Sequence, residues 1–390
     1  MAGWRNWSGK QRAEPGEIVR PKSEGAVVGA IDQARAQGTR IRCVGAAHSH
    51  SALAVTEGTL LDLEALSGVV RADAPRRVAT VLPATRIFQL GAPLRAAGLA
   101  LANQGDIDRQ AIAGAVATGT HGTGATLRCL SAAVAGVRLA LADGSIVDCG
   151  PDEEPELFQA ARLSLGALGV VLSLDLALRD AYRLRETLWL EDLEAVLERS
   201  AALASAHRHF EFFWFPGREK AVCKRIDETD DPAEYPLAGE GRRCAWSYEV
   251  LPSHRPDPHT EMEYSVSAAR GPACFREVRE LVSARFPELV WPLECRTVAA
   301  DDVWLSMAHA RPTVAISVHQ DAALDEEPLF RACEEVFLRH EGRPHWGKVH
   351  YLDGKRLRER HPRWDDWWRV RDAVDPDGIF LNDFVAGLRA

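Results

Sequence analysis

Several common signatures of function are missing from this 390-residue sequence. It holds eight cysteines, but no two of them stand at the spacing of a metal site, and no two histidines flank a glutamate one helical turn apart. These absences argue against the usual zinc sites, so we expect no bound metal. With no secretory signal in front of them, the cysteines are expected to be reduced and mostly buried.

Long apolar runs and an excess of basic charge are missing too. No apolar run reaches the length of a membrane helix, and the first ten residues mix tryptophan with charged side chains where a secretory signal would be apolar. The 47 Lys and Arg are outnumbered by 56 Asp and Glu, which gives a formal net charge of -9. Nucleic acid and anionic membranes are therefore not expected as partners, and a cytoplasmic enzyme is the default interpretation.

The patterns that are present predict an α+β protein of one or two domains, because 46% apolar residues suffice for a large core. Periodicity predicts helices at residues 24–37, 86–97, 190–206, 275–286 and 329–340. Alternation predicts strands at residues 41–44, 59–63, 78–82, 134–141, 145–149, 170–178, 209–215, 261–267, 291–298 and 313–319. From Arg179 onward glycines become fewer and aromatic and charged residues increase, which predicts a second domain.

The first candidate binding element is the loop that follows the strand at 41–44. Its residues are Gly45, Ala46, Ala47, His48 and Ser49. Successive backbone N–H groups without bulky side chains can form a nest for an anion such as phosphate. His48 would then lie beside whatever the loop binds. The alternative is that His48 and His50 are ordinary turn histidines, and the loop alone does not decide between the two.

A second stretch, residues 113–124, consists almost entirely of small residues. Small side chains cannot build a core over that length, so we expect them to let something large, such as a flat cofactor with a diphosphate, lie against the backbone. The spacing of its glycines is not that of a Rossmann dinucleotide fingerprint. A cluster of turns in a β-rich region is the alternative.

The end of the chain is rich in tryptophan and histidine. Trp364, Trp367 and Trp368 are spaced i, i+3 and i+4, which predicts one buried helix face in preference to a ligand-stacking site. Just before them stands the run His345-Trp346-Gly347-Lys348.

Four separated motifs together resemble one family. They are residues 44–49, residues 119–124, the segment 293–306 (Leu293-Glu294-Cys295-Arg296, Ala300-Asp301-Asp302 and Leu305-Ser306) and residues 345–348. With these the chain resembles the FAD-linked oxidases of the vanillyl-alcohol-oxidase type, and within them the sugar-1,4-lactone oxidases (gulonolactone and arabinonolactone oxidases) and the related alditol oxidases. The resemblance implies a bipartite FAD-binding domain, residues 1–178 plus 341–390, with an α/β cap domain at 179–340.

The resemblance also implies a cofactor and its contacts. FAD would be attached covalently to a ring nitrogen of His48, with no second attachment because no cysteine matches the one used by some related oxidases. We expect the other contacts to FAD from Gly45, Ala46, Ala47, Ser49, Gly105, Gly114, Thr118, Gly119, Thr120, His121, Gly122, Val170, Lys348 and Asn382.

The substrate-binding residues are expected from the cap and the C-terminal segment. Glu294 and Arg296 alternate along one predicted strand, so both face the same side. The resemblance places these two side chains, Lys348 and His319 in the substrate pocket as catalytic residues. Their alternative role is a structural salt-bridge network beneath the cap.

The resemblance implies oxidation of a CH–OH group, with hydride transfer to flavin N5. His319 resembles the lactone branch, which favours an aldono-1,4-lactone over an alditol. Gly105 matches a gate position where an alanine in lactone dehydrogenases obstructs oxygen. We therefore expect O2 as the electron acceptor and H2O2 as a product, and a dehydrogenase with another acceptor is the alternative.

Overall fold

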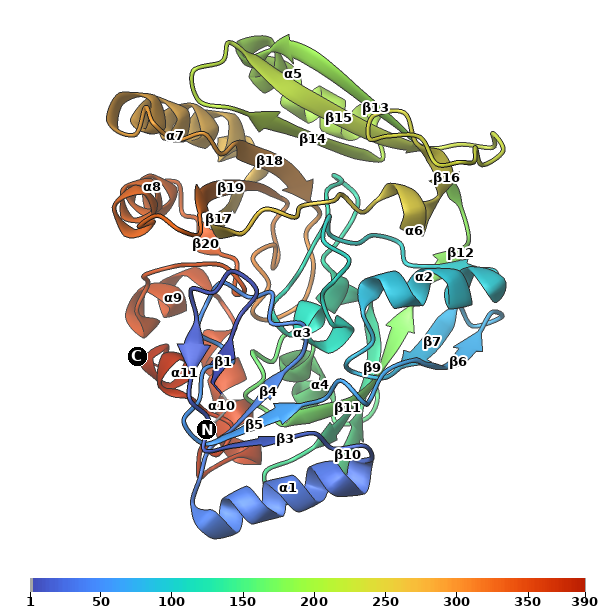
Figure 1. Ribbon diagram of the computed structural model, residues 1–390, viewed down its shortest axis with the longest axis vertical. Coiled ribbons are helices and arrows are strands. Elements are labelled where there is room, and N and C mark those ends of the chain that lie inside the picture. Colours follow the sequence, from blue (N-terminus) through green and yellow to red (C-terminus); the bar gives the residue numbers. More distant parts are fainter. Residues whose placement is uncertain (1–2, 390) are drawn as a thin grey trace.

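The computed structural model describes residues 3–389. Its N-terminal region holds two sheets (Figure 1). A three-stranded parallel sheet has the order β3-β5-β4, and a five-stranded antiparallel sheet has the order β10-β9-β11-β7-β6. Their strands are β3 (Glu17–Val19), β4 (Ile41–Val44), β5 (Thr59–Asp62), β6 (Val69–Asp73), β7 (Val78–Val81), β9 (Val134–Ala140), β10 (Ile146–Cys149) and β11 (Val170–Ala177).

Helices and two pairs of short strands complete this region. The helices are α1 (Glu24–Gln37), α2 (Ile87–Ala96), α3 (Ile112–Ala117) and α4 (Pro155–Ala161). α1 begins where the Ser23 side chain accepts from the N–H of Ala26 and ends at Gly38 in the left-handed conformation. The paired two-residue strands are β1 (Trp4–Arg5) with β2 (Arg12–Ala13) and β8 (Leu99–Ala100) with β12 (Arg179–Asp180).

The second region is one eight-stranded antiparallel sheet of order β16-β13-β15-β14-β18-β19-β17-β20. Helices α5, α7 and α8 pack against it (Figure 1). The strands are β13 (Arg183–Asp192), β14 (His209–Trp214), β15 (Lys220–Glu228), β16 (Cys244–Trp246), β17 (His259–Ser267), β18 (Leu293–Val298), β19 (Thr313–Asp321) and β20 (Arg343–Pro344). The helices are α5 (Leu193–Ala206), α6 (Ser247–Val250), α7 (Gly271–Arg285) and α8 (Glu327–Arg339).

The C-terminal helices α9 (Gly354–Arg360), α10 (Trp364–Val374) and α11 (Asp383–Gly387) return to the first region, beside β1 and β4 (Figure 1). The buried Arg42 guanidinium donates to the carbonyls of Leu53, Leu165 and Phe380. Asn382 donates to the carbonyls of Ala52 and Val55, each at 2.8 Å. These contacts tie the last residues to the segment that follows His48.

Most predicted elements are confirmed, with local corrections. Residues 190–192 were predicted as helix but end strand β13, because the Asp192 carboxylate caps α5 by accepting from the N–H of Ala195. Among the strands of at least four residues, β6, β13 and β15 were not predicted. Trp364, Trp367 and Trp368 are buried in the core, as expected. All eight cysteines are free, and seven are buried. Within residues 3–389 no helix is both long and apolar enough to cross a membrane.

Candidate active site

The loop after β4 lines a narrow cavity of about 140 Å³, which we call the small-residue cavity. Ala47 has a φ of 56°, so the chain turns through the left-handed region at this point. A Cβ on Gly45 would lie 2.7 Å from Cβ of Ala111, so the two glycine-rich stretches touch. Sequence-predicted residues that line it are Gly45, Ala46, Ala47, His48, Ser49, Gly114 and Thr118.

Four predicted FAD-contacting residues line neither this cavity nor the two that are described below. A Cβ on Gly122 would lie 2.2 Å from the carbonyl oxygen of Gln104, so this glycine makes room for the protein's own backbone. Gly119 is packed by Leu163 and Met307 in the same way. Val170 is fully buried in the core, and Asn382 binds loop carbonyls. Contact of these four residues with the cofactor stays a prediction.

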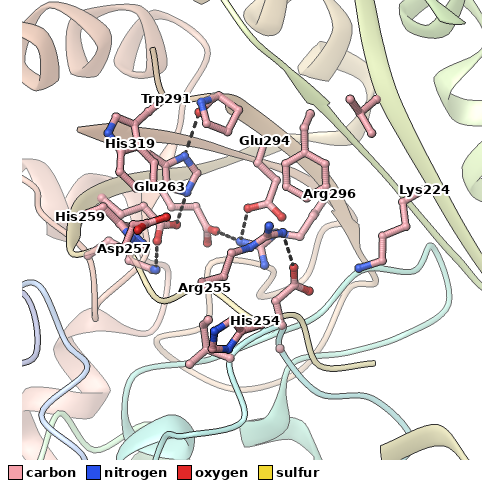
Figure 2. A pocket seen from close by; sticks show the side chains of 18 of the residues that line it. Lys224, His254, Arg255, Asp257, His259, Glu263, Trp291, Glu294, Arg296 and His319 are labelled. Atoms are coloured by element: carbon pink, nitrogen blue, oxygen red, sulfur yellow. Dashed lines mark hydrogen bonds and ion pairs between the residues drawn. The ribbon is translucent and has the colours of Figure 1, made fainter. Parts of the chain in front are cut away.

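A second cavity, of about 460 Å³, lies between the eight-stranded sheet and the loops that carry Gly105, Thr120, His121 and Lys348. We call it the charged cavity. Strand register brings its side chains together, because Glu261 pairs with His319, and Glu263 and Glu294 both pair with Ser317. Directly opposed residues point to the same face of a sheet. Figure 2 shows Glu263, Glu294 and Arg296 extending into one space.

The Arg296 side chain is fixed by Glu263, a residue of strand β17. Its guanidinium forms an ion pair with Glu263, which also accepts from the Ser317 hydroxyl at 2.9 Å and from Nε2 of His121 at 2.8 Å. Nδ1 of His121 lies 2.8 Å from the carbonyl oxygen of Gly122, so both ring nitrogens of this histidine face oxygen atoms. Burial opposes ionisation of Glu263, yet His121 and Arg296 hold its pKa well below the usual value. The result is a buried, fixed carboxylate between the Arg296 guanidinium and the His121 ring.

Glu294 has the opposite electrostatic character. Burial, and the nearby carboxylates of Asp106 and Glu211, raise its pKa to about 8 despite the guanidinium of Arg296 at 3.5 Å. The side chain is 6% exposed. Near neutral pH this carboxyl group therefore exchanges a proton readily, which suits a general acid or base.

Lys348 and His319 meet at Glu261. The Lys348 ammonium forms an ion pair with Glu261, and Nε2 of His319 lies 3.8 Å from the same carboxylate. Nδ1 of His319 donates to the carbonyl of Pro292 at 2.9 Å, which leaves Nε2 as an acceptor. Burial lowers the pKa of His319 to about 4, so this imidazole is neutral near pH 7.

His48 lies where the cavities meet. It lines the small-residue cavity and also a third cavity of about 620 Å³ that reaches Lys348 and Glu261. Its ring stacks on Trp7, with ring centroids 5.6 Å apart and an interplanar angle of 28°. Burial lowers its pKa to about 4, helped by Arg86 and Lys348. The ring is therefore neutral near pH 7 and has a free lone pair.

The three cavities fit a long cofactor with a phosphate end and a flat end. The small-residue cavity offers backbone and no acidic side chain, which suits phosphate oxygens. Gln110 lines all three cavities, so they are neighbours around this residue. The small-residue cavity is narrow enough for a diphosphate, and the larger third cavity beside it, which His48, Trp7 and Lys348 line, has space for the ring system of FAD.

Sequence reasoning missed most of the residues that line the charged cavity. Among the missed residues are Asp106, Lys224, Arg255, His259, Glu261, Glu263 and His345. Glu211, which was also missed, pairs with Lys224 at 2.9 Å. The alternation of Glu261 and Glu263 in a predicted strand was a usable signal. Some of these groups bring three ligand atoms within 4.8 Å of one another, for example His121, Glu263 and His345. Their carboxylates are already balanced by Arg296, Lys348 and Lys224, so we assign no metal to them.

The fold and these cavities define an FAD-dependent oxidoreductase with a large sheet over the cofactor region. The FAD binding domain family model matches residues 15–150. Cholesterol oxidase structures share the fold: a solvent-stable cholesterol oxidase superposes with a TM-score of 0.86 at 17% identity, covering 99% of this chain and 97% of that one.

The chain belongs to the D-arabinono-1,4-lactone oxidase family, whose model matches residues 174–247 and 237–388. It is 36% identical to an L-gulono-1,4-lactone dehydrogenase of Mycobacterium tuberculosis, over 98% of each chain. It is 33% identical to an alditol oxidase of Streptomyces sp., again over 98% of each.

Proposed function

We propose that this protein oxidises a CH–OH group of an aldono-1,4-lactone of the gulono or arabinono type, with FAD as hydride acceptor and O2 as final electron acceptor. The observation that carries the proposal is the charged cavity, in which Glu294, Arg296, His319 and Lys348 surround one space. Gln110 lines both this cavity and the small-residue cavity. The names of the relatives support the substrate class, since two of them act on lactones or alditols.

Residues around the small-residue cavity would hold the cofactor. Backbone N–H groups of the loop at 45–49 suit the diphosphate, and Gly114 and Thr118 form the opposite wall. Gly105, Thr120, His121 and Lys348 line the charged cavity, where the ring system would lie. When bound, FAD supplies a two-electron acceptor at N5 and passes the electrons to O2, which yields H2O2.

The residues of the charged cavity would bind the lactone and take up its hydroxyl proton. Arg296, fixed by Glu263, offers donors to the lactone oxygens. Nε2 of His319 accepts a hydrogen bond from a substrate hydroxyl. Glu294 takes the proton of the hydroxyl that is oxidised, because its pKa of about 8 lies near the working pH.

Anaerobic bleaching of the flavin tests this function directly. The holoenzyme is mixed with a panel of aldono-1,4-lactones and alditols, and the flavin absorbance is followed. Rapid bleaching by at least one lactone, slowed strongly in Glu294→Gln, is expected. No bleaching by any lactone or alditol would show that the protein has another substrate or no turnover.

We also propose that His48 is bonded to the flavin. The neutral ring between the two cavities has the lone pair that bond formation needs. Acid precipitation should leave yellow colour in the protein pellet, and His48→Ala should release the colour to the supernatant. His50→Ala is the matched control and should keep the colour in the pellet. Colour in the wild-type supernatant would exclude the attachment.

The electron acceptor is the least constrained part of the proposal. Gly105 lines the charged cavity, and a Cβ there would lie 3.2 Å from the carbonyl oxygen of His121 and 3.3 Å from Cγ2 of Thr120. An alanine methyl group would therefore press against His121 and Thr120. The glycine leaves this part of the cavity open, which supports access of O2. One relative is named a dehydrogenase, which favours another acceptor as the alternative. One H2O2 per lactone consumed supports O2, and lactone oxidation without peroxide supports the alternative.

Alditol oxidation is the second candidate, since one relative is an alditol oxidase. His319 is the residue that favours lactones. We expect His319→Thr to lower kcat/KM for lactones more than for alditols such as xylitol. An equal loss for both would remove this argument for the lactone.

A further inference from the structure

The charged cavity has a second half that is apolar. Side chains of this half come from β13, β14 and β15, from the loop before β18 and from the loop before β17. They are Leu188, Phe213, Phe215, Val222, Pro256, Val290 and Trp291. The proposed chemistry uses none of them. Phe215 is 39% exposed and Val290 is 77% exposed, so water meets apolar side chains at the mouth of a site whose other half is ionic.

Strand register arranges the two halves along one line. Val222 pairs with Phe213, Phe213 pairs with Glu294, Glu294 pairs with Ser317, and Ser317 pairs with Glu263. The row therefore changes from apolar to polar between β14 and β18. A ligand that lies across the strands with its polar end at Glu294 meets Phe213 and Val222 with its other end.

This row of side chains is longer than a simple sugar lactone. Neighbouring strands are roughly 4.8 Å apart, so the polar part from β18 to β17 spans roughly 10 Å and the apolar part from β15 to β18 adds roughly as much. A five-membered lactone with its short hydroxyl chain fills the polar part alone. Apolar surface next to it favours an apolar occupant over water.

The charged side chains beside the apolar half are paired within the protein, so they do not require a charged group on the ligand. Lys224, the cation nearest to Leu188 in the register, pairs with Glu211 at 2.9 Å and is 3.8 Å from Glu186. Its charge is thus balanced inside the protein. The guanidinium carbon of Arg255 lies 5.3 Å from the ring centroid of Phe213, and this guanidinium is paired with the Asp106 carboxylate at 3.5 Å. An uncharged extension of the ligand is the chemistry that this half can recognise.

We infer that the preferred substrate carries an apolar alkyl, acyl or aryl group on the end remote from the oxidised carbon. This inference rests on the proposed function for the polar end of the substrate. The apolar group lies against Phe213, Val222 and Phe215, and it displaces water from the mouth of the cavity.

Binding to the reduced holoenzyme tests this inference without turnover. The protein is reduced with dithionite under nitrogen, and affinities for L-gulono-1,4-lactone and its 6-O-butanoyl ester are measured by titration calorimetry. The ester should bind about tenfold more tightly, because its acyl chain leaves water for the apolar half. Phe213→Ser with Val222→Ser should abolish that ratio, whereas Leu324→Ser, a 55% exposed leucine outside the cavity, should keep it.

Three results would overturn the inference. Lactone and ester bind wild type with equal affinity, neither of them binds, or the tenfold ratio survives in the double variant. Aerobic turnover of the unmodified lactone is measured separately. Turnover without an ester advantage contradicts the apolar group alone. An ester advantage without turnover contradicts the proposed oxidation alone.

Discussion

The small-residue cavity and the charged cavity are built in different ways. The first is formed mostly by two stretches of chain, after β4 and around α3, and its binding groups are backbone atoms. The second takes side chains from strands that lie far apart in the sequence and meet only through the register of one sheet. Changes of side-chain chemistry should therefore act on the charged cavity, and changes of side-chain size on the small-residue cavity.

The largest expected effect is on turnover, from Glu294→Gln. We expect kcat/KM to fall by about 10²–10⁴-fold, the usual contribution of a general base. Because burial raises the pKa of Glu294 to about 8, the carboxylate form of the wild type, and with it kcat/KM, should increase as the pH rises through about 8. The variant should lack this step. Glu288→Gln, an exposed glutamate before the same strand, is the control, and an unchanged pH profile in Glu294→Gln would assign the proton to another group.

Arg296→Met should have the next largest effect, on stability. It leaves Glu263 and Glu294 buried with one cation fewer, and breaking such a pair costs about 3–5 kcal/mol. Urea unfolding measures the loss. Adding Glu263→Gln should restore part of it, since the two changes act on one pair. Arg369→Met, which breaks an exposed pair with Glu156, should not shift the midpoint, and strict additivity in the double variant would contradict the coupling.

The difference between the two cavities also explains which of their residues could be predicted from the sequence. The small-residue cavity was foreseen because its loop residues are consecutive, from Gly45 to Ser49. Glu294 and Arg296 were foreseen because they alternate on one strand, yet Lys224 and Glu211 were not. Their pairing depends on the register of β14 with β15, and β15 itself was not predicted. No local pattern specifies which strand of an eight-stranded sheet lies beside which.

Glycine variants distinguish glycines that are needed for packing within the protein from glycines that are needed for cofactor binding. Gly122→Ala should destabilise the protein by about 1–3 kcal/mol, because its Cβ would overlap the carbonyl of Gln104. Gly114→Ala meets no atom within 4 Å and lies inside α3, so apoprotein stability should stay equal or rise by up to about 1 kcal/mol. Its added methyl group faces the small-residue cavity, and we expect less FAD per chain. Thermal unfolding and FAD content measure the two effects, and normal FAD content in Gly114→Ala would contradict the assigned phosphate wall.

The smallest expected effect is the loss of stability in Asn382→Ala, which tests whether Asn382 contacts FAD as predicted. In the structure its amide donates to three carbonyls of residues 52–55, and its oxygen accepts from the N–H of Val385 at the start of α11. Asn382→Ala should therefore cost about 1 kcal/mol through the lost helix cap and loop contacts. Because these contacts do not involve the cofactor, apoprotein and holoprotein should lose equal stability in thermal unfolding. A loss of stability in the holoprotein alone would instead support the predicted contact between Asn382 and FAD.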